Sequence, residues 1–241
     1  MQEMEIRSGV IKPIECAKEA FELIKSEYWL LFAIWIVGSL IGGATLMIAG
    51  GAMTAGTFYA YLRKIDGEKA NFDDLWKGMQ WFLPGLKVML FIVVPVIVVY
   101  CVIYVPILMA AIMGPKLSES ELMSMFIGAF AVDFVLIILM VCFHTLLIFS
   151  FPLIVDKNLG AFKSIATSAR AVFKNFGGVG GLIGVNFVLI LAGYLALCVG
   201  VYLVIPIIIA TNVVAYRRVF PRQNNLRFEP PTPGIYGGGL N

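Results

Sequence analysis

Two ionisable residues lie inside a long apolar run, where a charge is unusual. Asp133 begins the segment DFVLIILMVCFH, and His144, the only histidine of the chain, ends it. A charged group inside a membrane is unfavourable, and it marks either an ion or proton pathway or a polar contact between helices. On a helix, eleven residues make three turns and about 16 Å. Both side chains therefore point the same way, but they cannot by themselves share a metal ion or a proton.

The apolar run that precedes Asp133 supplies hydroxyl groups at the matching height. The runs 88–113 and 125–155 are antiparallel if they are joined by the short connection at 114–124. Counted outward from that connection, Asp133 lies level with Tyr104, and Tyr100 is one turn away. We expect one of these hydroxyl groups to donate a hydrogen bond to the carboxylate, an interaction worth about 1 kcal/mol between membrane helices.

The same counting places His144 near Phe91 and Pro95. Proline has no backbone N–H, so the carbonyl group of Phe91 lacks its helical donor, and His144 can donate to it. A single histidine can also be an axial ligand of a haem or a chlorophyll-type pigment. Because the sequence shows no second ligand and no pigment-pocket motif, we expect no cofactor and no bound metal, and we favour structural hydrogen bonds over a transport pathway.

The composition is that of a protein with several membrane spans. Of 241 residues, 60% are hydrophobic and only 14% are charged, and the mean hydropathy is +0.92. Several apolar runs exceed the roughly 18 residues that mark a membrane helix. The fold class is therefore an all-α polytopic helical bundle, with residues 1–220 forming one integral membrane domain. The Pro- and Gly-rich segment 221–241 is expected to be a flexible cytoplasmic tail.

The distribution of basic residues sets the number of spans. If 28–62 and 177–216 each form two spans, 17 of the 18 Lys and Arg residues lie on one face of the membrane, and only Lys116 lies on the other. That arrangement obeys the positive-inside rule and puts both termini in the cytoplasm. The six predicted spans cover about 28–43, 45–62, 88–113, 125–152, 177–195 and 198–216.

A short amphipathic segment precedes each pair of predicted spans, at about 13–27, 71–83 and 158–175. Each is expected to lie in the cytoplasmic interface, which makes three helix-span-span units. An internal repeat supports them, because AGTFYAYLRK (55–64) resembles ATNVVAYRRV (210–219). At the ends of these two spans, aromatic-belt tyrosines and headgroup-binding arginines are predicted as interfacial anchors. They are Tyr61, Arg63, Tyr216, Arg217 and Arg218.

Small residues spaced for close helix packing occur in two segments, GSLIGG (38–43) and FGGVGGLIG (176–184). Glycine at intervals of four lets two helix backbones approach each other. The predicted packing positions are Gly38, Gly42, Gly177, Gly181 and Gly184.

Two longer segments, AGTFYAYLRKIDGEKANFDDLWKG and PLIVDKNLGAFKSIATSARAVFKN, together with the glycine-rich segment that follows the second, give the chain a family resemblance. It resembles an uncharacterised bacterial multi-pass family that is similar to the membrane domain attached to some glycerophosphoryl diester phosphodiesterases. The resemblance covers roughly residues 10–220. It implies a bacterial cytoplasmic (inner) membrane and supplies no catalytic residues, and the phosphodiesterase domain itself is missing.

An enzyme is the class that the sequence supports least, because it contains no Ser-His-Asp set, no HExxH and no paired carboxylates within the predicted spans. The four cysteines, Cys16, Cys101, Cys142 and Cys198, have no metal-ligand spacing. We expect a non-catalytic accessory or scaffolding subunit of a larger membrane complex, with membrane lipids and other membrane proteins as partners and no nucleic acid. The alternative is a transporter or lipid-handling protein with a polar path at Asp133 and His144.

Overall fold

The computed structural model describes residues 6–113, 118–196 and 199–222, and all regular structure within them is helical. Five helical segments of this part of the chain are long and apolar enough to cross a membrane. The predicted flexible tail beyond residue 222, Lys116 and Cys198 lie outside the described residues. The elements are α1 (Pro13–Ile24), η1 (Lys25–Glu27), α2 (Tyr28–Ala44), α3 (Gly50–Ile65), α4 (Asp74–Lys77), η2 (Gly78–Trp81), α5 (Phe82–Met113), α6 (Glu119–Leu146), α7 (Ser150–Lys157), α8 (Ala161–Lys174), α9 (Phe176–Leu195) and α10 (Gly200–Val219).

The core of the molecule lies around α3, which contacts α2, α5, α7 and α10. Small residues such as Ala52, Ala55 and Gly56 let these neighbours come close, and ten of the 16 residues of α3 are buried. With 16 residues, α3 is shorter than the five segments that could cross a membrane. Its burial shows that it is a packing helix at the centre of the fold.

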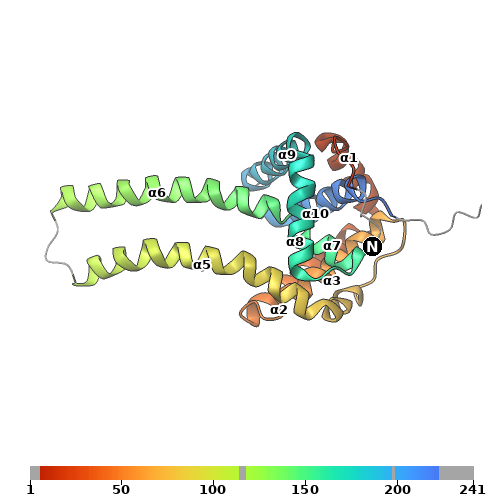
Figure 1. Ribbon diagram of the computed structural model, residues 1–241, viewed down its shortest axis with the longest axis horizontal. Helices are drawn as coiled ribbons and strands as arrows, with labels where there is room; N and C mark the ends of the chain where they lie inside the picture. The colour runs from red at the N-terminus through yellow and green to blue at the C-terminus, as the bar shows by residue number, and fades with distance from the viewer. Residues whose placement is uncertain (1–5, 114–117, 197–198, 223–241) are drawn as a thin grey trace, which may run out of the picture.

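Each short amphipathic segment packs on the last helix of a long pair. Helix α4 and η2 pack on α3, α8 packs on α7, and α1 packs on α10. The first and last parts of the chain are therefore joined through α1 and α10 (Figure 1). Helix α8 runs across the direction of α5 and α6 in the same view.

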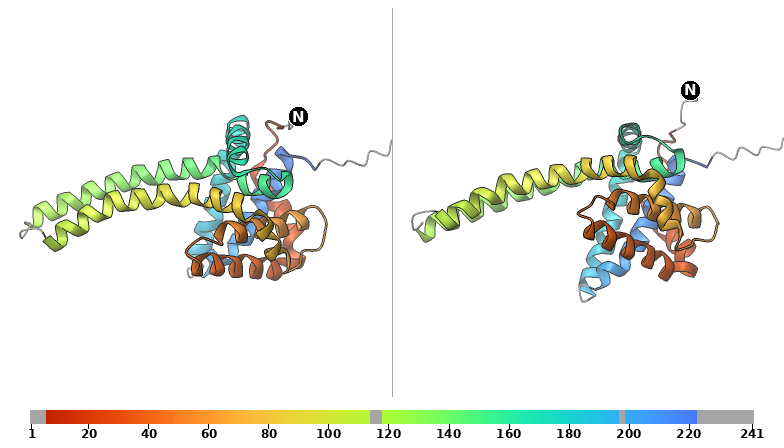
Figure 2. Two further views of the ribbon diagram at one scale, coloured as in Figure 1. Left: turned by 60° about the horizontal axis from the view of Figure 1, so that its bottom comes forward. Right: turned by 90° about the horizontal axis from the view of Figure 1, so that it is seen from below.

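Helices α5 and α6 form a hairpin that projects far beyond the rest of the molecule (Figures 1 and 2). At 32 and 28 residues they are about 48 and 42 Å long. In the most apolar 18-residue window of the segment that contains α6, no residue is buried, whereas 44% of the corresponding window in α10 is buried. The hairpin is thus apolar but almost uncovered by its own chain.

The apolar run 125–155 is not one continuous helix, in contrast to the predicted span 125–152. It breaks between Leu146 and Ser150. Ser168 of α8 bridges the break: its hydroxyl group donates to the carbonyl oxygen of Leu146 at 2.7 Å and accepts from the N–H of Phe149 at 3.1 Å. The backbone groups freed by the break are paired, so α7 can turn into the core.

The second amphipathic segment is also shorter than its predicted range of 71–83. It consists of α4 and η2, eight residues in all, and α5 already begins at Phe82. Asp73 stands at the N-cap position of α4, but its side chain makes no capping hydrogen bond. Instead, the side-chain oxygen of Asn71 accepts from the N–H of Asp73 at 3.3 Å, which forms a turn before the helix.

Two of the predicted glycine positions lie where α2 meets α3. A Cβ atom at Gly38 would come within 3.1 Å of Leu75, and one at Gly42 within 3.1 Å of the Gly50 Cα atom. In the other segment, Gly181 lies against Pro13, with a Cβ-to-Cγ distance of 2.7 Å.

At Gly177 and Gly184, a Cβ atom would meet no other described residue within 4 Å, so neither glycine is required for a helix contact in this part of the chain. The tightest backbone contacts occur at glycines that the sequence pattern did not indicate. A Cβ atom at Gly51 would lie 2.2 Å from the carbonyl carbon of Gly85, and one at Gly56 would lie 2.0 Å from the Leu75 oxygen. Only a residue without a side chain lets α3 approach α5 and α4 this closely.

Candidate functional site

A groove of about 520 Å³ runs between α5 and α6 and contains all four predicted intramembrane polar residues. We call it the hairpin groove. Most of its lining is aliphatic, contributed by side chains such as Val96, Ile103 and Leu136. The polar residues that line it are Tyr100, Tyr104, Asp133, His144 and Thr145.

Asp133 accepts a hydrogen bond from the hydroxyl group of Tyr104, with an O···O distance of 3.0 Å. This is the pair expected from the antiparallel arrangement of the two helices. Tyr100 does not bind the carboxylate but stacks on the Tyr104 ring, with ring centroids 5.3 Å apart and planes 15° apart. Both tyrosines remain exposed, at 58% and 46%. The carboxylate is thus tied to α5 by one hydrogen bond on an uncovered surface.

His144 does not make the expected bond to the carbonyl group of Phe91. Its Nδ1 atom donates to the carbonyl oxygen of Met140, one turn back on the same helix, at 2.7 Å. Because a carbonyl oxygen can only accept, this bond places a proton on Nδ1. Phe143 packs against the imidazole edge and also against Phe91, so an aromatic contact replaces the predicted hydrogen bond between α5 and α6.

The groove combines a carboxylate, a phenol and an imidazole along an otherwise apolar path. Asp133 and His144 are three turns apart, about 16 Å along the helix, so each can meet a ligand separately but they cannot act on one atom. Among the described residues, no three His, Cys, Asp or Glu side chains lie together where they could hold a metal ion. Chemically, the groove suits an amphipathic ligand or an apolar helix that carries a hydrogen-bond donor.

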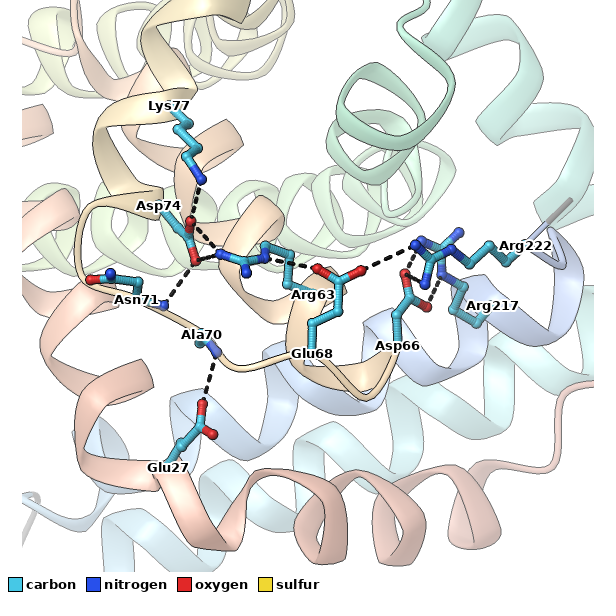
Figure 3. Close-up of polar contacts among 10 residues, drawn as sticks. All are labelled: Glu27, Arg63, Asp66, Glu68, Ala70, Asn71, Asp74, Lys77, Arg217 and Arg222. Carbon is cyan, nitrogen blue, oxygen red and sulfur yellow. Dashed lines mark hydrogen bonds and ion pairs between the residues drawn. The ribbon is translucent and has the colours of Figure 1, made fainter. Parts of the chain in front are cut away.

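A second polar region lies at the opposite end of the core, where the sequence analysis predicted only headgroup anchors (Figure 3). We call it the charged cluster. Its centre is Asp74, which is fully buried. Both carboxylate oxygens accept from Arg63 at 2.8 Å, and Lys77 and the N–H of Asn71 also donate to them, each at 2.9 Å.

The charged cluster continues from Arg63 to the end of α10. Arg63 also donates to Glu68 at 3.1 Å, and Glu68 accepts from Arg222 at the same distance. These two guanidinium groups, Arg63 before Arg222, lower the pKa of Glu68 below its ordinary value. Arg217 binds Asp66 through two nitrogens at 2.9 and 2.7 Å. The loop after α3 is thereby tied to the end of α10.

Asp156 connects α7 to the same cluster. It forms an ion pair with Arg217 at 2.8 Å and accepts a hydrogen bond from the hydroxyl group of Tyr216, also at 2.8 Å. The two charged side chains are only 12% and 13% exposed. The ends of α3, α7 and α10 are therefore held together by ionic contacts that are largely shielded from solvent.

The predicted interfacial anchors have a different role. Tyr61 and Tyr216 are both fully buried, so neither forms an aromatic belt. Arg63 and Arg217 are bound to carboxylates of the charged cluster, and Arg218 forms an ion pair with Glu19 at 2.7 Å. An aromatic residue followed by arginines is typical of a membrane boundary, but the same pattern serves here to lock helix ends inside the protein.

Together, the fold and the two polar regions define an all-helical protein with several helices that could span a membrane. No family model, curated protein or solved structure matches the chain.

Proposed function

We propose that the chain inserts into a bacterial cytoplasmic membrane as three helical hairpins, with the charged cluster and both termini in the cytoplasm. In this arrangement six helices enter the bilayer, as three helix-span-span units. It would place 17 of the 18 Lys and Arg residues on one face, in accord with the positive-inside rule. The packing of each short amphipathic segment on the last helix of another unit also supports this arrangement. The family resemblance points to the same kind of protein.

Helix α8 has the surface of an interfacial helix. Its protein-facing side holds Ala161, Ser164 and Ser168, which are buried. Exposed phenylalanines lie on a second side, with Phe162 at 73% and Phe173 at 67%. A third side carries exposed cations, namely Lys163, Arg170 and Lys174. A helix that lies across α5 and α6 with these three faces fits the boundary between acyl chains and anionic headgroups.

The function that this architecture supports best is that of a non-catalytic accessory or scaffolding subunit, which binds another integral membrane protein through the α5–α6 hairpin. One observation carries the proposal: the α5–α6 hairpin projects from the bundle without cover from the rest of the described chain, and it bears the Asp133 carboxylate. Polar groups within membrane helices face a protein interior or a water-filled path, because lipid cannot pair with them. Partner helices over the hairpin groove would shield Asp133 and add a second hydrogen bond.

Purification from native membranes in a mild detergent tests this function. The chain is expected to elute with a second membrane protein, and Asp133→Ala is expected to reduce the recovered partner about tenfold, as a lost buried polar contact would. Glu22→Ala is the matched control, because it removes an exposed carboxylate paired with Lys25 and lies far from the hairpin. A single monodisperse monomer, with no partner before or after substitution, would rule out the proposed subunit.

A second function is favoured by one feature, the presence of Asp133 and His144 in the same continuous groove. A transporter or lipid-handling protein would use them as polar steps along the hairpin. In reconstituted vesicles, Asp133→Asn would then abolish solute flux or lipid movement, since the amide cannot carry a charge or a proton. If the unchanged protein shows no transport, or if Asp133→Asn transports as well as the unchanged protein, the carboxylate takes no part in such a mechanism.

A further inference from the structure

The turn between α2 and α3 is apolar and uncovered. Leu46, Met47 and Ile48 are 87%, 44% and 58% exposed. No charged residue occurs from 28 to 62, so the two helices and their turn form one uncharged hairpin. Figure 2 shows this turn on the side toward which the α5–α6 hairpin projects, well short of that hairpin's end. Helix α2 is the uncharged part of Pro13–Ala44, one of the five segments of membrane-spanning length, whose first part carries charged residues. At 17 and 16 residues, α2 and α3 are each about 25 Å long, less than the roughly 30 Å of a bilayer core.

The backbone N–H groups of this turn need no water. Every N–H group from 45 to 50 donates to an acceptor within the hairpin, at distances of 2.8 to 3.1 Å. Five of these acceptors are carbonyl oxygens, and the sixth is the Thr45 hydroxyl oxygen, which accepts from Ala49. The Thr45 hydroxyl group itself donates to Ile41 at 2.8 Å. A turn in hydrocarbon must satisfy its donors in this way, whereas a turn in water need not.

The turn also has bulky apolar residues at two positions whose backbone conformation favours smaller residues. Leu46 and Met47 have φ angles of 49° and 67°, in the left-handed region. Glycine and asparagine are the usual residues there, because a large side chain strains the backbone. Apolar side chains at both positions are understandable if the turn is surrounded by acyl chains, where asparagine would be poorly solvated.

The α5–α6 hairpin shows the opposite chemistry near its end. Ser118 and Glu121 form a capping box at the start of α6: the hydroxyl group accepts from the N–H of Glu121, and the carboxylate accepts from the N–H of Ser118. Ser120 is exposed beside them. A charged, exposed helix start belongs in water, so the two hairpins end in different surroundings.

This inference rests on the proposed sidedness but departs from it in the first unit: we infer that the α2–α3 hairpin is re-entrant and not a pair of full spans. It inserts from the side of the charged cluster and ends among lipid acyl chains without reaching water on the other side. An apolar groove of about 430 Å³ between this turn and α5 offers a place for an acyl chain. Its lining includes Leu46, Met47, Ile48, Leu90, Val93 and Val94.

Single-cysteine labelling in intact cells tests this inference. In a background in which the four native cysteines are replaced by alanine, Leu46→Cys, Ser120→Cys and Lys163→Cys are each treated with a membrane-impermeant maleimide, before and after permeabilisation. Ser120→Cys is expected to react from outside, and Lys163→Cys only after permeabilisation. Leu46→Cys is expected to react about tenfold more slowly than Ser120→Cys before permeabilisation, and about tenfold more slowly than both after it, because hydrocarbon excludes the reagent. It should react fully once detergent unfolds the protein.

A nitroxide attached at Leu46→Cys provides the second measurement. Its relaxation should respond to dissolved oxygen, which concentrates in hydrocarbon, and not to a water-soluble nickel chelate. Fast maleimide labelling of Leu46→Cys from either side, or strong relaxation by the chelate, would overturn the re-entrant hairpin. If Ser120→Cys and Lys163→Cys instead react from the same side, the proposed topology fails, while a shielded Leu46→Cys still places the turn in hydrocarbon.

Discussion

The hairpin groove and the charged cluster present carboxylates in opposite ways. Asp133 has one hydrogen bond, from Tyr104, and lines an open groove on a projecting hairpin. Asp156 is held by Arg217, Tyr216 and Lys157, and is only 12% exposed. The comparison separates a carboxylate that several groups of its own chain bind, which holds helix ends together, from a carboxylate with one hydrogen bond, which we propose a partner covers.

The largest effect is expected for Asp156→Ala, which removes the contact between α7 and the end of α10. Arg217 would lose one of its two carboxylate partners and Tyr216 its acceptor, so the folded state should lose about 3 kcal/mol, as when one member of a buried pair is removed. Thermal unfolding in detergent, followed by tryptophan fluorescence, measures it. Glu22→Ala, in an exposed pair, should change stability by less than about 1 kcal/mol. Equal effects would show that the charged cluster is not structural.

The second-largest loss of stability is expected where the backbones of α3 and α4 meet at Gly56. Gly56→Ala is expected to lower stability by about 1–3 kcal/mol, because its Cβ atom would lie 2.0 Å from the Leu75 oxygen and α3 would have to move away from α4. Gly184→Ala is the control, since nothing lies within 4 Å of its Cβ atom, and alanine there should be neutral or slightly stabilising. A neutral Gly56→Ala would contradict the close packing of α3, and the same melting experiment decides it.

A smaller effect is expected in the hairpin. Tyr104→Phe removes the single hydrogen bond to Asp133 and should lower the stability of the purified chain by no more than about 1 kcal/mol. Its effect on partner recovery should be larger than its effect on melting, because the tyrosine orients the carboxylate toward the groove. A loss of stability as large as that of Asp156→Ala would mean that the hairpin is part of the folded core.

The smallest effect depends on pH. Because Arg63 and Arg222 lower the pKa of Glu68, the ionised carboxylate stabilises the fold above its ordinary pKa, and this contribution is lost as the pH falls through the folded-state value. The melting temperature of Glu68→Gln should therefore lie slightly below that of the unchanged chain at neutral pH, and the two should converge once the pH has fallen below the folded-state pKa of Glu68. If the difference in melting temperature between the two proteins instead grew as the pH fell, the ionised Glu68 carboxylate would not stabilise the fold.

The sequence was sufficient for features that depend on local spacing. The Tyr104–Asp133 hydrogen bond follows from counting along two antiparallel helices on either side of a short connection. His144 could not be placed in the same way, because the carbonyl group of its own helix at Met140 is always within reach, whereas that of Phe91 depends on how the helices are rotated. The presence of several helices that could span a membrane is confirmed, and the number of crossings stays a proposal.

Features that depend on tertiary packing could not be predicted from one sequence. Tyr61 and Tyr216 stand at the ends of apolar runs, and only the packing of α3 and α10 in the core shows that they are buried. Arg63 is bound by Asp74, 11 residues later on α4, and Arg217 by Asp66 and Asp156, which come much earlier in the chain, and no spacing rule pairs any of them. Likewise, Ser168 gave no signal, because its role depends on the helix break 19 to 22 residues earlier.

Site-specific photocrosslinking in native membranes tests most directly whether the hairpin binds a protein. A photoreactive amino acid is placed at Ile137, which is 61% exposed and lines the hairpin groove, and at Leu40 of α2, which is 66% exposed, as the control. The account predicts a discrete protein adduct from Ile137 and lipid adducts from Leu40. Lipid adducts alone from both positions would contradict it, because the uncovered hairpin would then face only the bilayer.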